Sequence, residues 1–248
     1  MYHNKVVLIG RLTKDISIEP VNGTIVGRSN LAVNKAFKIG NDRSADFIPL
    51  QIWGKIAETH ANYIKKGDMA FVEGRVQTRS FETTENGKPK KNYMLEFIVE
   101  SIKYMDKTAN GSYNNVDLLG RLTKDLELGT SPSGKKYARG TIAIQRSYKN
   151  AQGQRETDFI PFQVWGDKAE TYAKNTQKGS LIMLGATLQT RTYNEGNSSR
   201  FVMEVVGNTM TFLGGVKKEN SGTDPRWQYD QQNEPPQQEE QPYFGGQQ

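Results

Sequence analysis

The chain has 248 residues, 35% of them hydrophobic and 24% charged, with no cysteine and a formal net charge of +6. The lack of cysteine excludes disulfides, thiolate catalysis and thiolate metal sites, and no apolar run approaches the length that spans a bilayer. The first ten residues lack the form of a signal peptide, so we expect a soluble protein in a reduced intracellular compartment.

The charge is divided unevenly along the chain. Residues 1–111 carry 17 basic and 12 acidic side chains, residues 112–220 carry 15 and 10, and residues 221–248 carry one and five. Two basic units followed by an acidic tail favour a polyanionic partner for the units. Mild basicity also serves solubility, so charge alone does not identify the partner.

The first hundred residues predict strands grouped around one helix. Alternation of apolar residues indicates the strands, and the Asn22-Gly23 pair is typical of a hairpin. The helix is expected to present Ile56, His60 and Tyr63 or Ile64 on its apolar face and to stop at Gly67. The predicted segments are strands at 6–12, 28–37, 46–53, 69–81 and 94–105, a helix at 55–66, and a basic hairpin tip at 84–91.

The remainder of the chain repeats this order. The stretch DFIPLQIWGKIAET at 46–59 returns as DFIPFQVWGDKAET at 158–171, with ten of fourteen positions identical. GRLTKD occurs at 10–15 and again at 120–125. We therefore expect two similar domains, at 1–108 and 112–216, joined by a short linker.

The repeated strand has two different faces. One face holds ordinary aliphatic core residues, and the other holds two aromatics, an amide and a proline. The expected core residues are Ile48, Leu50 and Ile52, then Ile160, Phe162 and Val164, and the expected outer residues are Phe47, Pro49, Gln51 and Trp53, then Phe159, Pro161, Gln163 and Trp165. An aromatic outer face that occurs twice predicts a surface for stacking flat ligands.

Residues 217–248 have a different composition. They are rich in Gln, Pro and Gly and show no periodic apolar pattern, which predicts a disordered acidic tail. Pro242, Tyr243 and Phe244 stand out there as a weak candidate for docking a partner protein.

Several of these segments, in the right order, resemble the bacterial single-stranded DNA-binding protein family. They are VVLIGRLTKD, DFIPLQIWGK, KKGD after the helix, EGRVQTRSF, and NTMTFLGG at 208–215. The resemblance implies a mainly β protein with two tandem OB-fold domains, each a five-stranded Greek-key barrel with one helix. It further implies sequence-independent binding of single-stranded DNA in replication, repair and recombination, within the cytoplasm and associated with the nucleoid. A homodimer would present four OB domains, the number that single-domain relatives reach as tetramers.

In this family bases stack on aromatics while basic residues follow the phosphates. The aromatic positions that match are Phe37, Phe47, Trp53 and Phe81, then Tyr148, Phe159, Trp165 and Tyr193. The candidate phosphate contacts are Arg11, Lys14, Lys35, Lys55, Arg75 and Arg79, then Arg121, Lys124, Arg146 and Arg191. Asp167 replaces Lys55 in the second copy, so the two domains should not bind equally. The family's tail ends in Asp residues followed by a terminal Pro-Phe, from which this chain departs by four added residues.

No group of residues predicts catalysis, a metal or a cofactor. GTSPSGKK at 129–136 comes within one residue of a phosphate-binding loop, but it lies between two predicted strands and is interpreted as a hairpin. His3 and His60 cannot form a metal cluster without further ligands. Two alternatives to DNA coating remain open: a duplicated OB-fold scaffold that binds proteins, for replication restart or as a mobile-element accessory, and RNA binding.

Overall fold

The computed structural model describes residues 2–35, 44–85, 88–106, 108–150, 152–195 and 198–214. Twelve strands and two helices are found in these residues. None of the described helices combines the length and apolar character that a membrane crossing requires.

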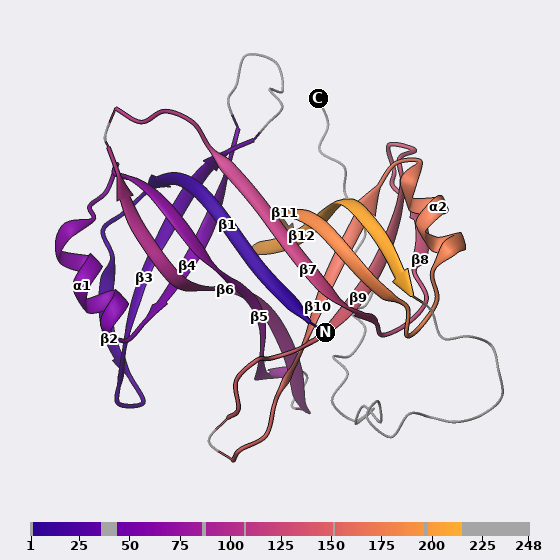
Figure 1. Ribbon diagram of the computed structural model, residues 1–248, viewed down its shortest axis with the longest axis horizontal. Coiled ribbons are helices and arrows are strands. Elements are labelled where there is room, and N and C mark those ends of the chain that lie inside the picture. Colours follow the sequence, from indigo (N-terminus) through magenta and orange to yellow (C-terminus); the bar gives the residue numbers. More distant parts are fainter. Residues whose placement is uncertain are drawn as a thin grey trace.

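The first half of the chain forms a closed five-stranded barrel (Figure 1). Its elements are β1 (His3–Leu12), β2 (Ser17–Val21), β3 (Thr24–Asn34), β4 (Ala45–Trp53), α1 (Lys55–Tyr63), β5 (Met69–Glu85) and β6 (Lys88–Met105). Neighbours run in the order β1, β3, β4, β6, β5 and return to β1, with β4 parallel to β6 and the other pairs antiparallel. The short strand β2 extends β3 outside this circuit.

The second half repeats the barrel. Its elements are β7 (Tyr113–Leu122), β8 (Glu127–Thr130), β9 (Lys136–Gln145), β10 (Thr157–Trp165), α2 (Lys168–Asn175), β11 (Leu181–Glu195) and β12 (Ser198–Gly214). The circuit β7, β9, β10, β12, β11 closes on β7. This closure, with a helix between the third and fourth barrel strands, is the OB-fold that the sequence predicts.

Two hairpins predicted from the sequence are present. Asn22 and Gly23 have φ values of +49° and +78° and connect β2 to β3, as a two-residue turn between antiparallel strands requires. The predicted hairpin at 129–136 is present: residues 131–135 form the turn between β8 and β9, where the Ser131 amide donates to the Lys135 carbonyl at 2.8 Å. Because a strand and not a helix follows, this turn lacks the helix N-terminus of a phosphate-binding loop.

The repeated motif GRLTKD closes each barrel. A Cβ on Gly10 would lie 2.3 Å from the Ala32 carbonyl oxygen, and one on Gly120 would lie 2.4 Å from that of Ala143. Only glycine therefore allows β1 and β7 to approach β3 and β9 closely enough to complete the circuit. Asp15 accepts the Lys66 amide proton at 2.7 Å and ties the end of the motif to the turn after α1.

The two barrels have equivalent cores. Matching strand positions are fully or almost fully buried in both halves: Leu8, Leu31, Ile48, Ile52 and Val72 in the first, and Leu118, Ile142, Ile160, Val164 and Leu184 in the second. Each such side chain contributes about 1.5–3 kcal/mol on leaving water. The predicted inward faces of β4 and β10 are confirmed.

The predicted helix is wrong in its end and only partly right in its buried face, since Ile64 is 1% exposed and Ile56 packs against the core as predicted. α1 ends at Tyr63, and Gly67, with φ of +88°, belongs to the following turn. Ala57 and Ala61 face the core, whereas Tyr63 is 76% exposed and His60 is only partly buried. Close packing explains the choice of alanine, since the Ala57 Cβ lies only 2.9 Å from where a Cβ on Gly27 would stand.

The two barrels share one continuous sheet. β1 and β7 pair antiparallel from His3↔Leu119 to Ile9↔Tyr113, and they cross the middle of the molecule side by side in Figure 1. The exposed strand edge that each unit would have alone is thus paired within the chain. β5–β6 and β11–β12 are long hairpins, and their outer parts reach toward the opposite barrel (Figure 1).

Candidate nucleic-acid interface

The outer faces of β4 and β10 carry the predicted aromatics. Phe47 is 50% exposed and Trp53 is 40% exposed, while Phe159 and Trp165 are half-buried. Along both strands these rings alternate with fully buried aliphatic residues, so the backbone holds them on the surface. The exposed surface of the Phe47 and Trp53 rings can stack on bases.

Arginines and an aromatic lie along one face of β5. Arg75, Gln77, Arg79 and Phe81 alternate with buried or opposite-facing residues, and the Arg79 guanidinium carbon lies 5.9 Å from the Phe81 ring centroid. The Arg79 Nε donates to Glu96, a residue only 6% exposed, at 2.6 Å. Glu96 thereby orients the guanidinium above the surface, where its outer nitrogens can meet a phosphate.

The same arrangement recurs on β11. Arg191 donates twice to the Glu204 carboxylate, at 3.0 and 2.7 Å, and Gln163 of β10 donates to the same carboxylate at 3.1 Å. The Arg191 side chain remains 43% exposed. This bidentate pair fixes the orientation of the arginine on β11, which is separated from the Trp165 strand β10 by β12.

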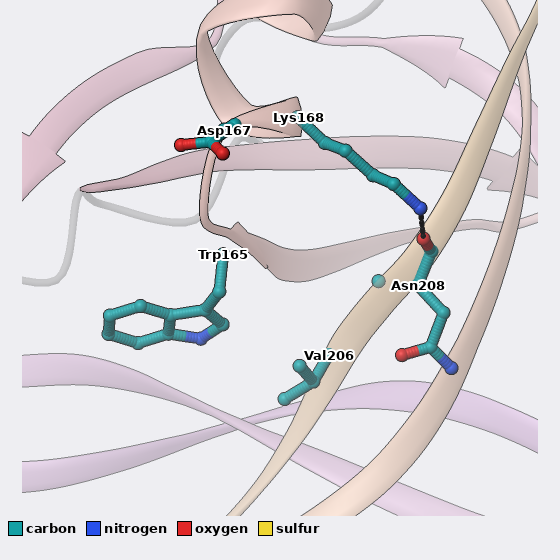
Figure 2. A pocket seen from close by; sticks show the side chains of 6 residues that line it. Trp165, Asp167, Lys168, Val206 and Asn208 are labelled. Carbon is teal, nitrogen blue, oxygen red and sulfur yellow. Dashed lines mark hydrogen bonds between the residues drawn. The ribbon is translucent and has the colours of Figure 1, made fainter. Parts of the chain in front are cut away.

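Trp165 forms one wall of an open hollow of about 530 Å³, shown in Figure 2. Asp167 and Lys168 lie on one side and Val206 and Asn208 on another, and the Lys168 Nζ donates to the Asn208 carbonyl at 3.4 Å. The hollow is open to solvent and leaves room for a flat group beside the indole. Asp167 gives this hollow an acidic edge, whereas Lys55 at the matching place in the first barrel is cationic.

The sequence analysis did not identify Tyr137 and Arg139 as residues of this surface. The Tyr137 ring of β9 lies 5.3 Å from the Trp165 ring, and the Arg139 guanidinium carbon lies 4.7 Å from the Tyr137 centroid. Tyr137 lies directly opposite Trp165 in the antiparallel pairing of β9 and β10, so predicting the register of these two strands would have placed the two rings together. The Tyr-Ala-Arg sequence at 137–139 also indicates that Tyr137 and Arg139 lie on the same face of the strand, because side chains two residues apart point the same way.

Two equivalent clasps join the barrels beneath these aromatics. The Thr190 amide of β11 donates to Asp46 at 2.7 Å, and the Thr190 hydroxyl oxygen accepts the Phe47 amide proton at 3.0 Å. In the other clasp the Thr78 amide donates to Asp158 at 3.1 Å, and the Thr78 hydroxyl accepts from the Phe159 amide at 3.3 Å. We call these the Asp46–Thr190 clasp and the Asp158–Thr78 clasp. Each places an interface phenylalanine against the other barrel.

Each buried aspartate forms an ion pair with a basic residue that lies just after the end of the preceding strand, β3 or β9. Arg146 donates to both Asp158 oxygens at 2.8 Å, and its side chain is 11% exposed. Burial lowers the pKa of the Arg146 guanidinium, but the hydrogen bonds and charge of Asp158 outweigh burial and raise it above its ordinary value. At the equivalent place Lys35 makes one ion pair with Asp46 at 3.5 Å. The two clasps are therefore of unequal strength.

Tyr148 crosses the domain boundary. Its ring centroid lies 5.1 Å from the guanidinium carbon of Arg75 in the first barrel and 5.9 Å from that of Arg146 in its own. The ring is 42% exposed. The structure thus brings Tyr148 together with Arg75, two residues that lie in different repeats.

The other basic candidates lie in different surroundings. Arg11 and Arg121 donate to the Gly67 and Gly179 carbonyls at 3.1 and 2.7 Å, so both tie β1 and β7 to the turns after the helices. Lys124 pairs with Glu127. Lys14 and Lys55 are exposed, Lys55 as the first residue of α1.

Some predicted residues cannot be placed. Phe37 and the tail residues Pro242, Tyr243 and Phe244 lie outside the described residues, as does the side chain of Tyr193. The proposed domain limits of 1–108, 112–216 and 217–248 stay a prediction. Within the described ranges, no three His, Cys, Asp or Glu side chains are grouped to hold a metal ion.

Comparison with known proteins supports the interpretation of this surface as a nucleic-acid interface. Residues 3–105 and residues 113–213 each match the profile of the "Single-strand binding protein family". Single-stranded DNA-binding protein 3 of Clostridium acetobutylicum is 41% identical over 121 residues, which cover 45% of this chain and 82% of that protein. The single-stranded DNA-binding protein of Bacillus cereus is 44% identical over 110 residues, covering 44% of this chain and 63% of that protein.

A solved structure matches over a greater length. The crystal structure of wild-type single-stranded DNA binding protein from Thermus aquaticus superposes with a TM-score of 0.67 at 26% identity, covering 90% of this chain and 99% of that one. The superposition therefore spans both barrels. The resemblance inferred from the sequence is confirmed by these matches.

Proposed function

The chain belongs to the single-strand binding protein family, and on that premise we propose that it coats single-stranded DNA without marked sequence preference. Base stacking on the outer-face aromatics and phosphate contacts from arginine and lysine provide the binding energy. Coating of this kind serves DNA replication, repair and recombination, and it places the protein beside the chromosome.

One observation carries this proposal. Each barrel presents a tryptophan and a phenylalanine on an outer strand face, with an oriented arginine on the neighbouring hairpin: Trp53, Phe47 and Arg79 in one, Trp165, Phe159 and Arg191 in the other. A folding core does not require these rings, because the inward faces are already filled. Stacking is tolerant of sequence because every base has a π-face.

The protein-scaffold alternative accounts for this surface less well, and the RNA alternative is decided by a direct comparison of the two polymers. A protein-binding scaffold would not require exposed rings at equivalent places in both barrels. RNA can stack on the same rings, and RNA and DNA differ at the 2′-hydroxyl. We infer that the protein has a binding role and no catalytic one.

A titration tests the proposed function. Oligo-dT should quench the tryptophan emission strongly, whereas duplex DNA of equal length should not, because paired bases are already stacked inside the helix. Affinity should fall with salt at a log–log slope near −0.7 for each phosphate neutralised. A matched oligo-U gives the RNA comparison. Equal binding of duplex and single strand, or an affinity independent of salt, would favour the scaffold.

We also propose two protein contacts. A second copy would complete a four-barrel particle, and Phe244 in the acidic tail would recruit replication or repair proteins. Sedimentation should give a dimer both for the full chain and for a chain lacking residues 239–248. The truncated chain should bind oligo-dT normally but recover fewer partner proteins. A monomer at micromolar concentration rejects the first contact, and unchanged partner recovery rejects the second.

A further inference from the structure

Both terminal nitrogens of the Arg75 guanidinium donate hydrogen bonds within the protein. One terminal nitrogen donates to Glu100 at 2.6 Å, and the other donates to the Tyr148 hydroxyl at 3.1 Å and to Gln77 at 3.3 Å. The Arg75 side chain is 22% exposed, and its Nε is buried without a hydrogen-bond partner. A phosphate approaching this group would have to displace partners that already hold it.

Tyr148 is held from several directions and still presents a surface. Its hydroxyl accepts from Arg75 and donates to Gln77 at 3.3 Å, so both partners of the phenol come from β5 of the other barrel. Arg75 and Arg146 both lie near the ring, at 5.1 and 5.9 Å from its centroid. With 42% of the side chain exposed, a base can still reach it.

The equivalent place in the second barrel lacks this arrangement. The strand registers pair Arg75 with Ile98 and Thr187 with Val206, so Thr187 stands where the first barrel has Arg75. By the same registers Asn208 stands where the first barrel has Glu100. Both members of the Arg75–Glu100 ion pair are therefore replaced together. β11 has no guanidinium at this position to hold an aromatic of the first barrel.

We propose that Arg75 is a positioning residue, which fixes the Tyr148 ring of the second barrel as a preformed stacking platform. The two halves of the chain then engage single-stranded DNA unequally, with the tighter contact where β5 meets Tyr148. This inference rests on the proposed function and concerns how its surface is built. A ring already held in place loses less side-chain freedom when a base stacks on it, so its binding is stronger.

A double-mutant cycle distinguishes positioning from phosphate contact. The variants are Arg75→Ala, Tyr148→Ala and the two combined, with Thr187→Ala as the matched control from the other barrel. Each full-length protein is titrated with oligo-dT over a salt series. Arg75→Ala should weaken binding roughly twofold to tenfold, Tyr148→Ala should weaken it more, and the double variant should match Tyr148→Ala. The salt slope should not change, and Thr187→Ala should bind like the unaltered protein.

Other results would overturn the inference. If Arg75 contacts phosphate, Arg75→Ala should reduce the steepness of the salt slope by about 0.7 and should weaken binding equally in the Tyr148→Ala background. Undiminished affinity of Arg75→Ala would show that the contact does not matter for binding. Thermal unfolding of each variant identifies any loss caused by misfolding. Failure of the unaltered chain to bind oligo-dT would instead reject the proposed function.

Discussion

Replacing Trp53 and Trp165 together by alanine should weaken binding to oligo-dT by roughly thirtyfold to ten-thousandfold, because each stacked base contributes about 1–3 kcal/mol. The two indoles occupy equivalent outer positions on β4 and β10, where Trp53 is 40% exposed and Trp165 borders the hollow of Figure 2. Each single replacement should have part of the effect. Competition against a labelled oligo-dT measures affinity without relying on the removed fluorophores.

The matched control is Tyr63→Ala. Tyr63 is a more exposed aromatic than Trp53, at 76%, but it lies at the end of α1 and not on the outer strand face. Its removal should leave the affinity unchanged. If the double tryptophan variant binds as tightly as the Tyr63 variant, stacking on these strands is not the source of affinity.

Asp158→Ala should lower the free energy of unfolding by about 3–5 kcal/mol, the usual result of removing one partner from a buried ion pair. Asp158 is 1% exposed and accepts from Arg146 twice and from Thr78 of the other barrel. Without it, a largely buried guanidinium keeps only the exposed carboxylate of Glu156 as a partner, and the Thr78 amide loses its acceptor. Urea denaturation followed by far-ultraviolet circular dichroism measures the change.

Two variants calibrate this result. Asp46→Ala should destabilise less, because its cation Lys35 is 3.5 Å away and 34% exposed. Glu19→Ala removes an exposed pair with Arg28 and should cost about 0–1 kcal/mol. Equal losses of unfolding free energy in all three variants would mean that the Asp158–Thr78 clasp adds no more than a surface contact.

Asp158→Ala should also weaken DNA binding, since Arg146 lies beside Tyr148.

Local pattern determined the two repeated units and the aromatic face, and the family resemblance implied that each unit is a barrel. Alternation along 46–53 and 158–165 separates inward from outward side chains because strand side chains point to opposite faces in turn. The Asn22-Gly23 turn was predictable because its conformation is local. The buried face of the helix was only partly predictable, because tight packing of Ala57 and Ala61 against the barrel, and not side-chain size alone, selects it.

Contacts between distant parts of the chain were beyond sequence reasoning. The pairing of β1 with β7, the clasps and the Arg75–Tyr148 contact join residues more than 70 positions apart, and no local periodicity records which strand edges meet. The sequence alone determined that there are two similar domains, because long segments repeat in the same order. It also determined which strand faces are buried and which rings remain outside, because side chains alternate along a strand. The barrel architecture was implied by the family resemblance. Only the tertiary structure decided that the barrels share one sheet and that Arg75 donates to Tyr148 of the opposite barrel, because those contacts depend on the closed barrels being placed side by side.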